Sequence, residues 1–331
     1  MNPSKTLIHM AAAACVSLAS GAALAQQADW PAHAITLVVP FAAGGGGDTL
    51  ARLVAEPLSR ELGQSIIVEN RPGAGGNIGT QAVAKAPRDG HTLLMTISSS
   101  QAINPALYRK PGFDPVKDFR PIGLIGSVPN VLLAHPGFVA KSVPELIAMA
   151  RGRPDEFRYA SAGNGTLNHL LGEMLNSMAG IQLQHVPYKG VAPALNDVLG
   201  GQVPLLFGSL PSTLPHIQAG RLRALAVSGA ARSPLLPDVP TIGETVPGYN
   251  GTLWVGLFAP EGVPAPVLAQ LQDGMARALA AGDLRGKLEA SVVELAGPAD
   301  RPVPPAQMAA LLREDIAKWA RIVKASGASL D

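Results

Sequence analysis

Short runs of Val, Ile and Leu alternate along the chain with longer segments in which apolar residues recur every three or four positions. The short runs predict β-strands, and because they are apolar throughout they suit sheets that are covered on both faces. The longer segments predict amphipathic helices. This alternation indicates an α/β fold. The runs that predict strands are residues 35–39, 65–68, 92–96, 131–134, 158–160, 205–207 and 222–227.

The clearest helix is expected over residues 166–179, where six apolar side chains form one stripe. His169 lies opposite that stripe, so we expect it to be solvated rather than buried. Another helix is expected after Asp48, a good N-cap residue, and Pro57 should bend or break it near residues 53–56 because proline removes a backbone hydrogen bond. Three further helices are expected over residues 267–279, 282–291 and 305–326.

Two glycine-rich turns each follow an apolar run and precede a helical segment, in LVVPFAAGGGGDTLARLV and in IIVENRPGAGGNIGTQAV. The first N–H groups of a helix lack an internal partner, and the helix dipole places partial positive charge there. Glycine also lets the backbone take positive φ and leaves room for a ligand. Both turns are therefore predicted to receive an anion such as a carboxylate or a phosphate.

Residues 1–25 have the pattern of a cleavable signal peptide: one lysine, a run rich in Ala and Leu, and a closing Ala-Leu-Ala. The apolar run is shorter than the ~20 residues that a membrane span needs. The only cysteine, Cys15, lies inside this segment. The exported chain should therefore contain no disulfide, no cysteine nucleophile and no cysteine-bound metal.

The whole chain carries a formal net charge of +2 and is close to neutral without Lys5. It has no basic cluster of the kind that binds nucleic acid, so we expect no nucleic-acid partner. The ~306 residues after the signal suggest two domains. The 30 prolines and 36 glycines separate periodic segments instead of forming tracts, which predicts a globular chain.

Three catalytic or cofactor patterns are incomplete. Gly44-x-Gly46 and Glu69 suggest a dinucleotide site, but Thr49 stands where the third glycine belongs. Ser161 lies in Tyr-Ala-Ser-Ala-Gly, which is half of a nucleophile elbow. The seven histidines include no His-Glu-x-x-His motif and no close pair. We therefore expect neither a metal site nor a cofactor.

Four short polar loops follow predicted strands, and each offers hydroxyls together with free amides. Alone, each would be an ordinary turn or helix cap, as Asp48, Asn164 or Thr166 would be anyway. Together they favour a binding site, because ligands of open α/β sheets lie beyond the carboxyl ends of the strands. The loops are residues 40–48, 98–101, 161–166 and 208–212.

Several long motifs, found in order from about Trp30 to the C-terminus, resemble those of the Bug family of periplasmic solute-binding proteins, the substrate-binding subunits of tripartite tricarboxylate transporters. They are PFAAGGGGDTLARL, VENRPGAGGNIGTQAVAKAPRDGHTLL, AINPALY, DPVKDFRPIGLI, YASAGNGT, HVPYKG and LPHIQAGRLRALAVS. The resemblance implies a type II periplasmic binding protein fold, with two α/β domains that close on a ligand by hinge motion. We expect the crossings between domains near Ser127 and Asn250. Domain 1 would be residues 26–126 plus 250–331, and domain 2 residues 127–249.

The resemblance also implies how a ligand is held. The loop matching residues 41–48 would bind one carboxylate, partly through ordered water, and the loops at Ser99, Ser161 and Ser209 would supply further contacts. Phe41 either stacks on an aromatic acid or plugs the end of the sheet, and Tyr188 either contacts the ligand or belongs to the core. The candidate ligand-binding residues are Phe41, Ala42, Gly44, Gly45, Asp48, Ser99, Ser100, Ser161, Asn164, Gly165, Thr166, Tyr188, Ser209 and Ser212.

Three positions depart from the family's usual residues. Gly46 and Gly47 replace bulkier or hydroxyl residues, Gln101 replaces histidine, and Gly208-Ser209 replaces acidic or amide side chains. The pocket should therefore be wider and less charged. The loop over residues 204–215 offers no carboxylate to a ligand ammonium, which favours a plain carboxylate over an amino acid.

Together these observations predict a monomeric periplasmic protein, not an enzyme, that captures a small organic carboxylate. Its partners would be the membrane subunits of a tripartite transporter, or a sensor if its role is sensory. The remaining alternative is a secreted serine hydrolase that acts through Ser161 or Ser209 with His169 or His216.

Overall fold

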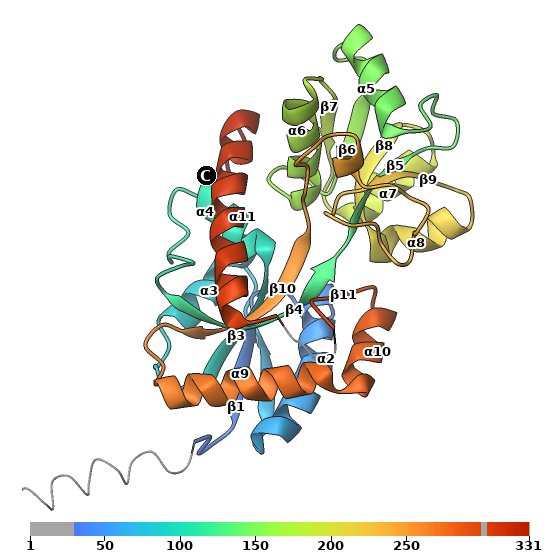
Figure 1. Cartoon of the computed structure of the whole chain (residues 1–331). Coiled ribbons are helices and arrows are strands. Elements are labelled where there is room, and N and C mark those ends of the chain that lie inside the picture. Colours follow the sequence, from blue (N-terminus) through green and yellow to red (C-terminus); the bar gives the residue numbers. More distant parts are fainter. Residues whose placement is uncertain (1–29, 299–302, 331) are drawn as a thin grey trace, which may run out of the picture.

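The computed structural model describes residues 30–298 and 303–330, so the expected signal peptide over residues 1–25 lies outside the described residues. The chain forms two α/β domains, each built on its own sheet, which stand one above the other in Figure 1. In the described ranges, no helix has both the length and the apolar character needed to span a bilayer.

Both sheets are mixed. The strands are β1 (Ile35–Val39), β2 (Ile66–Asn70), β3 (Thr92–Ile97), β4 (Phe119–Val128), β5 (Asn130–Ala134), β6 (Arg158–Ser161), β7 (Gln184–Pro187), β8 (Leu205–Ser209), β9 (Arg223–Val227), β10 (Leu253–Pro260) and β11 (Glu294–Leu295). The six-stranded sheet has the order β11-β4-β10-β3-β1-β2, in which β10 runs antiparallel to β3 and β4. The five-stranded sheet has the order β7-β6-β8-β5-β9, in which β5 runs antiparallel to β8 and β9.

Helices cover both faces of each sheet. They are α2 (Gly46–Leu62), α3 (Asn77–Ala84), α4 (Asn104–Leu107), α5 (Val143–Gly152), α6 (Leu167–Ala179), α7 (Val191–Leu199), α8 (Leu210–Gln218), α9 (Ala265–Ala280), α10 (Gly282–Ala290) and α11 (Pro305–Ser326), with the short turns η2 (Ala74–Gly76), η3 (Ser99–Ile103) and η4 (Ile242–Glu244). The three C-terminal helices and the helix after residue 166 lie where the apolar pattern predicts them.

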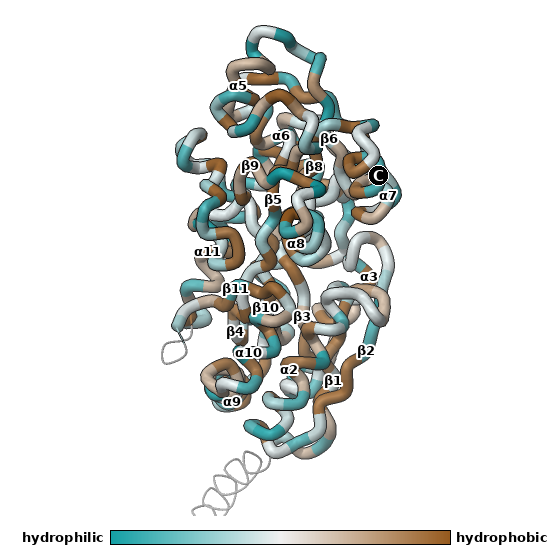
Figure 2. Tube along the Cα trace, turned by 90° about the vertical axis from the view of Figure 1, so that its right-hand side faces the viewer, coloured by the Kyte–Doolittle hydropathy of each residue, from teal (hydrophilic) through white to brown (hydrophobic). Residues whose placement is uncertain are grey.

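Side chains alternate across the strands, and in the inner strands the side chains on both faces of each sheet are buried. In β1, Leu37 packs in the same cluster as the apolar faces of α2 and α9, while Val38 belongs to the cluster that contains α11. In β8, Leu206 packs with α7 and Phe207 packs with α6. Figure 2 shows the apolar strand positions in brown between helices with teal outer positions. The expectation of strands covered on both faces is confirmed for the inner strands, whereas the edge strand β2 leaves Ile67 57% exposed.

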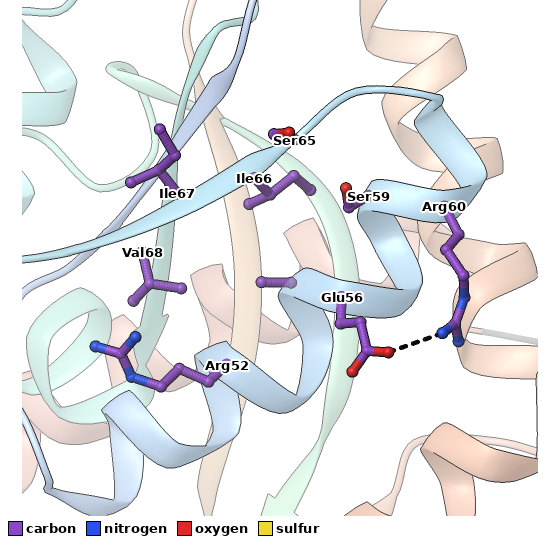
Figure 3. Close-up of a pocket in the computed structure, with 9 residues that line it drawn as sticks. Arg52, Glu56, Ser59, Arg60, Ser65, Ile66, Ile67 and Val68 are labelled. Carbon is purple, nitrogen blue, oxygen red and sulfur yellow. Dashed lines mark hydrogen bonds and ion pairs between the residues drawn. The ribbon is translucent and has the colours of Figure 1, made fainter.

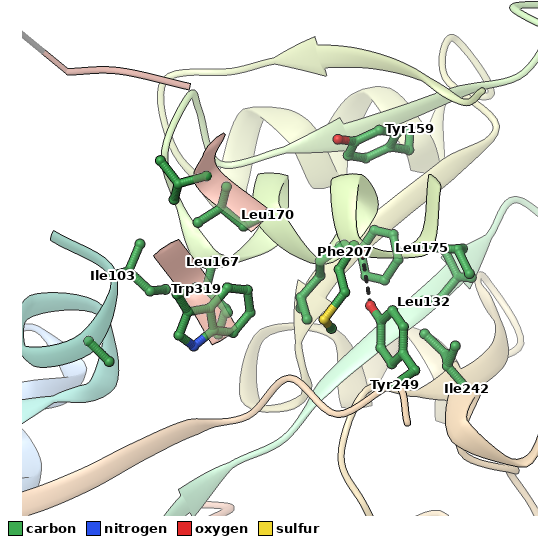
Figure 4. Close-up of a cluster of buried hydrophobic side chains, with 14 of the residues drawn as sticks. Ile103, Leu132, Tyr159, Leu167, Leu170, Leu175, Phe207, Ile242, Tyr249 and Trp319 are labelled. Atoms are coloured by element: carbon green, nitrogen blue, oxygen red, sulfur yellow. Dashed lines mark hydrogen bonds between the residues drawn. The ribbon is translucent and has the colours of Figure 1, made fainter. Parts of the chain in front are cut away.

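One apolar cluster continues from the first domain into the second through α11 and α6. Trp319 of α11 is fully buried near Ile103 and near Leu167 and Leu170 of α6 (Figure 4). In the same region the hydroxyl of Tyr249 donates a hydrogen bond of 2.9 Å to a carbonyl of α6. The two domains are therefore packed against each other on this side.

The chain passes from the first sheet to the second at Pro129, between β4 and β5, and returns through residues 250–252 between η4 and β10. Ser228 holds the two crossing segments together. Its N–H donates to the carbonyl of Asn130 at 2.9 Å, and its hydroxyl donates to the carbonyl of Gly251 at 2.6 Å. The N–H of Gly251 donates back to the Ser228 carbonyl at 2.8 Å.

The first helix differs from its prediction in two ways. The sequence predicts a bend or a break at Pro57, and α2 continues through this residue without a break. Proline costs this helix one hydrogen bond, whereas α2 packs its buried face against β2, α9 and α10, which outweighs that loss. The helix also begins at Gly46 with Gly45 as its N-cap, so Asp48 lies in the first turn and not at the cap.

His169 is buried, with only 7% of its surface exposed, and its predicted solvation is wrong. The ring of His185, from β7, stacks on it at 4.0 Å between centroids, and the N–H of Gly165 donates to its Nδ1 at 3.1 Å. The hydrophobic pattern does not predict β7, so it could not show what covers this face of α6.

The pattern also does not predict β4, β10 and β11. β4 and β10 are interrupted by proline and glycine and pair with two register shifts, so they lack the continuous apolar run that marks the other strands. β11 has only two residues. These strands are where the first sheet becomes antiparallel.

Candidate ligand-binding site

The loop between β1 and α2 presents an open helix start. The first hydrogen bond inside α2 runs from the N–H of Thr49 to the carbonyl of Gly45 at 3.0 Å, so the N–H groups of residues 46–48 have no partner within the helix. Asp48 lies in this first turn, and its carboxylate accepts a hydrogen bond of 2.8 Å from the N–H of Gly44. That bond, and then the guanidinium of Arg52, lowers the pKa of Asp48.

Beside this helix start, a cavity of about 580 Å³ opens between the two domains. Its size is in the range of sites for small ligands. The first domain supplies Phe41, Ala42, Gly45, Gly46, Gly47, Thr49, Leu50, Ile97 and Ser291; the second supplies Ser209, Pro211 and Ser212; and the strands at the crossings supply Val128, Leu253 and Val255. The cavity is therefore shared by both domains and by the segments that connect them.

The polar groups of the cavity are backbone amides and hydroxyls, and its lining contains no charged side chain among the described residues. Ser209 is the N-cap of α8, and its hydroxyl lies 3.0 Å from the hydroxyl of Ser212. The first N–H of α8, at Leu210, is already donated to the carbonyl of Pro129 at 2.8 Å. The second domain thus contributes mainly hydroxyls, whereas the first contributes the free amides of α2.

The second glycine turn, by contrast, is packed with side chains. A Cβ on Gly76 would lie 2.5 Å from the Ser100 hydroxyl and 3.3 Å from the Phe41 ring. The carbonyl of Gly75 accepts hydrogen bonds from Ser100 and Asn104, and the N–H of Gly76 is donated to the carbonyl of Gly73. These glycines permit close packing, and the turn does not offer the open helix start that its sequence predicts.

Five of the predicted ligand residues line the cavity: Phe41, Ala42, Gly45, Ser209 and Ser212. Gly44 and Asp48 belong to the same loop as the first three and are joined by the hydrogen bond described above. Two predicted ligand residues lie in η3. Ser99 is half-buried, and Ser100 is buried and donates a hydrogen bond of 3.2 Å from its hydroxyl to the carbonyl of Gly75.

The loop over residues 161–166 lies outside the lining of this cavity. Ser161 is fully buried, Asn164 is exposed, and Gly165 packs against Leu107 and Leu330. The hydroxyl of Thr166 caps α6 and donates to the carbonyl of Gly163 at 2.7 Å.

Tyr188 also lies outside the lining. Its hydroxyl donates to the carboxylate of Asp197 at 2.6 Å. Partial burial and this carboxylate raise the pKa of Tyr188 to about 12. The Tyr188 hydroxyl therefore already has a hydrogen-bond partner, Asp197, within its own domain.

Ser161 belongs to a buried chain of polar groups. Its hydroxyl lies 2.6 Å from Nε2 of His185, which stacks on His169, and Nε2 of His169 lies 3.9 Å from the carboxylate of Glu173. Glu173 accepts a hydrogen bond of 2.7 Å from Tyr159. The pairing of Ser161 with His169 that a hydrolase was expected to use is therefore not formed, because Nδ1 of His169 accepts from Gly165 instead.

Sequence reasoning missed most of the apolar wall of the cavity. Val128, Leu253 and Val255 come from the crossing strands, and Ser291 follows α10. None of them lies in a polar loop after a predicted strand, so no local signal marks them. Gly46 and Gly47 belong to the glycine turn that the sequence predicts to receive an anion, and both line the cavity.

A second hollow lies on the outer surface between α2 and β2 (Figure 3). It belongs to the first domain alone. Its cations are already paired, since Arg52 contacts Asp48 at 3.0 Å and Arg60 contacts Glu56 and Asp283 at 3.0 and 3.1 Å. The cavity between the domains is the stronger candidate for a ligand, because the first N–H groups of α2 in its wall have no partner within the helix.

Comparison with known proteins gives consistent matches. Residues 50–328 match the family model described as "Tripartite tricarboxylate transporter family receptor". Protein BugT of Bordetella pertussis is 36% identical over 303 residues, which cover 91% of each chain. The structure of R. palustris Rpa4515 with adipate is 39% identical, with a TM-score of 0.75, over 91% of this chain and 100% of that chain. MatC from Rhodopseudomonas palustris with bound malate is 35% identical, with a TM-score of 0.72, over 89% of this chain and 100% of that chain.

Proposed function

The chain belongs to the tripartite tricarboxylate transporter receptor family, and from this membership we propose that it is a periplasmic solute-binding protein for a small organic dicarboxylate. The observation that carries the proposal is the open N-terminus of α2 at the wall of an interdomain cavity whose described lining has no charged side chain. Two similar proteins hold adipate and malate, which are both dicarboxylates.

One ligand carboxylate would accept hydrogen bonds from the free amides at the start of α2, where the helix dipole favours negative charge. The other would reach the hydroxyls of Ser209 and Ser212 in the second domain. Phe41, Ile97 and Leu253 would contact the apolar part of the ligand. A ligand held from both sides favours the closed arrangement of the domains, because only that arrangement makes all the contacts.

The hinge would be formed by Pro129 and residues 250–252, with the Ser228 hydrogen bonds keeping the two crossing segments in register. Domain 1 would comprise residues 26–126 plus 250–331 and domain 2 residues 127–249. In this proposal the signal peptide exports a monomer that needs no cofactor and catalyses no reaction. Its partners are the membrane subunits of a tripartite transporter.

Thermal shift followed by calorimetry on the chain from Gln26 to Asp331 tests this function. Adipate and malate should raise the melting temperature, because a ligand at 100 times its Kd adds about 2.7 kcal/mol to the free energy of unfolding. The corresponding diamides should cause no shift, since they lack the negative charge that the helix start attracts. Absence of a shift across a panel of mono-, di- and tricarboxylates would contradict the proposal.

Two variants locate the site. The double change Ser209→Ala and Ser212→Ala should weaken dicarboxylate binding by about tenfold or more, because two hydroxyl contacts worth about 1 kcal/mol each are lost. Ser177→Ala, at an exposed position of α6 outside the cavity, is the matched control and should bind as the wild type does. Equal affinities for all three proteins would place the ligand elsewhere.

A serine-directed fluorophosphonate probe tests the hydrolase alternative. Ser161 has no exposed surface, so a probe cannot reach it in the folded protein. We expect no labelling of the native chain. Stoichiometric labelling that disappears in Ser161→Ala or Ser209→Ala would show an activated serine and overturn the assignment as a binding protein.

A further inference from the structure

Three residues that can bind a metal meet at the N-terminal ends of β1 and β3, and the ligand loop follows the other end of β1. They are His33, Asp89 and His91. His33 precedes β1 and His91 precedes β3, and these two strands are adjacent and parallel. The five residues of β1, which span about 16 Å at about 3.3 Å per residue, lie between the cluster and the ligand loop.

Each of the three side chains offers one ligand atom, and these atoms all lie within 4.8 Å of one another. Nδ1 of His91 is 3.5 Å from Oδ1 of Asp89. Nδ1 of His33 contacts the carbonyl of Ala34 at 3.1 Å, which leaves Nε2 of this ring as the ligand. A metal-bound histidine commonly donates its other ring N–H to a carbonyl in this way.

His91 has an unusual environment for a histidine. Only 8% of its surface is exposed, and neither ring nitrogen has a hydrogen-bond partner within the described part of the chain. Buried polar groups of native proteins are normally satisfied, so each orphaned group calls for a missing partner. A metal ion between these side chains would bind one ring nitrogen of His91 and so supply the missing partner of that nitrogen.

We propose that His33, Asp89 and His91 bind one divalent transition-metal ion, and that this ion is Zn²⁺. Two imidazoles and one carboxylate form a donor set that zinc accepts in tetrahedral geometry, with an open fourth position. Hard cations such as Mg²⁺ and Ca²⁺ prefer oxygen ligands and fit these residues poorly. This site is distinct from the carboxylate site and does not depend on it.

Binding requires one rearrangement. The rings of His33 and His91 are stacked at 3.8 Å between centroids with 24° between their planes, and a metal must lie in the plane of each ring that binds it. His33 and Asp89 are exposed, and Asp89 already accepts a hydrogen bond of 2.9 Å from the N–H of His91, whereas the ring of His91 is buried beside Trp30. Rotation of His33 out of the stack would bring the ligand atoms to the roughly 3.3 Å separations of a tetrahedral zinc site.

The ion would tie the segment before β1 to the turn before β3. Gly90, between two of the ligands, has φ +84°, and a side chain there would collide with Val267 and crowd Trp30. The turn is thus held in place before any metal binds. A metal at this position should raise the stability of the protein without changing its affinity for carboxylates.

The test uses the chain from Gln26 to Asp331, purified without a polyhistidine tag and treated with a chelator. Calorimetry with ZnCl₂ should show one ion bound per chain, and the melting temperature should rise with zinc and fall again on addition of EDTA. His33→Ala and Asp89→Asn should each weaken zinc binding by at least about tenfold. Both positions are exposed, and Asp89→Asn keeps a side-chain oxygen that can accept the hydrogen bond donated by the backbone N–H of His91.

His135→Ala, in the second domain, is the matched histidine control and should bind zinc as the wild type does. Adipate affinity should be the same with and without zinc in every variant, so failure of this proposal can be told apart from failure of the carboxylate site. Absence of a one-to-one zinc complex, or full zinc affinity in both His33→Ala and Asp89→Asn, would overturn the proposal. Binding of Cu²⁺ but not Zn²⁺ would overturn the choice of metal.

Discussion

At the scale of single residues, the neighbours of a side chain decide its chemistry. Ser161 follows a strand and precedes a glycine turn, as a nucleophile or ligand serine can, yet it is fully buried against His185. Burial, and then the nearby His169, lower the pKa of His185 to about 4. Burial also lowers the pKa of His169. Both rings are therefore neutral near pH 7 and serve the packing of the loop over residues 161–166.

These two histidines predict a pH dependence of stability. Their folded pKa values lie below the ordinary value of 6.5, so between about pH 6.5 and pH 4 the unfolded chain binds more protons than the folded one. The free energy of unfolding should be steady above about pH 7 and should fall as the pH drops through this window. The contribution of His185, discounted for its partial exposure, is of order 1 kcal/mol.

Urea denaturation from pH 4 to pH 8 measures this effect. His185→Gln removes one titrating group while keeping a side chain that can hydrogen-bond Ser161, so its loss of stability at low pH should be smaller than that of the wild type. Parallel pH profiles for the two proteins would show that His185 titrates normally in the folded state.

At the scale of elements, the two glycine turns differ although their sequences look alike. In the first, the glycines at the start of α2 line the cavity, and a Cβ on Gly46 would meet nothing within 4 Å. In the second, Gly76 has φ +99° and lies against Ser100 and Phe41. Glycine therefore leaves the wall of the cavity open in the first turn and permits dense packing in the second.

A pair of alanine substitutions separates these roles. Gly76→Ala should lower the free energy of unfolding by about 1–3 kcal/mol, because alanine is strained at this positive φ. Gly46→Ala should change stability by less than about 0.5 kcal/mol, since its methyl group meets open space. Chemical denaturation of both variants provides the measurement, and an equal loss of stability would mean that the first turn is also packed.

At the scale of the whole molecule, the lining of the candidate site comes from both domains. The cavity lies between them, while α6 and α11 join them through the shared apolar cluster on another side. The domains are thus in contact on one side and separated by the cavity on the other. The gap contains amide and hydroxyl dipoles instead of ion pairs, and the whole chain has a net charge of only +2.

This distribution of charge predicts that ligand affinity changes little with ionic strength. Dipoles act over short distances inside the cavity, whereas salt mainly screens exposed charges that are farther apart than the Debye length of about 8 Å at roughly 0.15 M. We expect the Kd for adipate to rise by less than about threefold between about 0.05 and 0.5 M NaCl. Calorimetry across this range tests the prediction, and a tenfold rise would indicate that Arg or Lys side chains contact the ligand.

The sequence predicts the elements that depend on local periodicity and misses strands whose pairing depends on distant segments. Continuous apolar runs such as Ile35–Val39 are found as strands, and the helix over residues 305–326 has the predicted bounds, because both depend on local periodicity. The predicted α/β fold and the resemblance to the Bug family are confirmed. Local periodicity did not identify β4 and β10, whose bulged antiparallel pairing is set by partners far away in the chain.

The sequence by itself determined the fold class, the family and the open start of α2, because the hydrophobic pattern and the glycine turn act through neighbours in the chain. Only the tertiary structure decided which polar loops share a cavity, why the second glycine turn is filled, and that His169 is buried. It also brought His33 to Asp89 and His91. Each of these depends on contacts between segments that are distant in sequence, and no local pattern of residue types specifies which distant side chain completes such a contact.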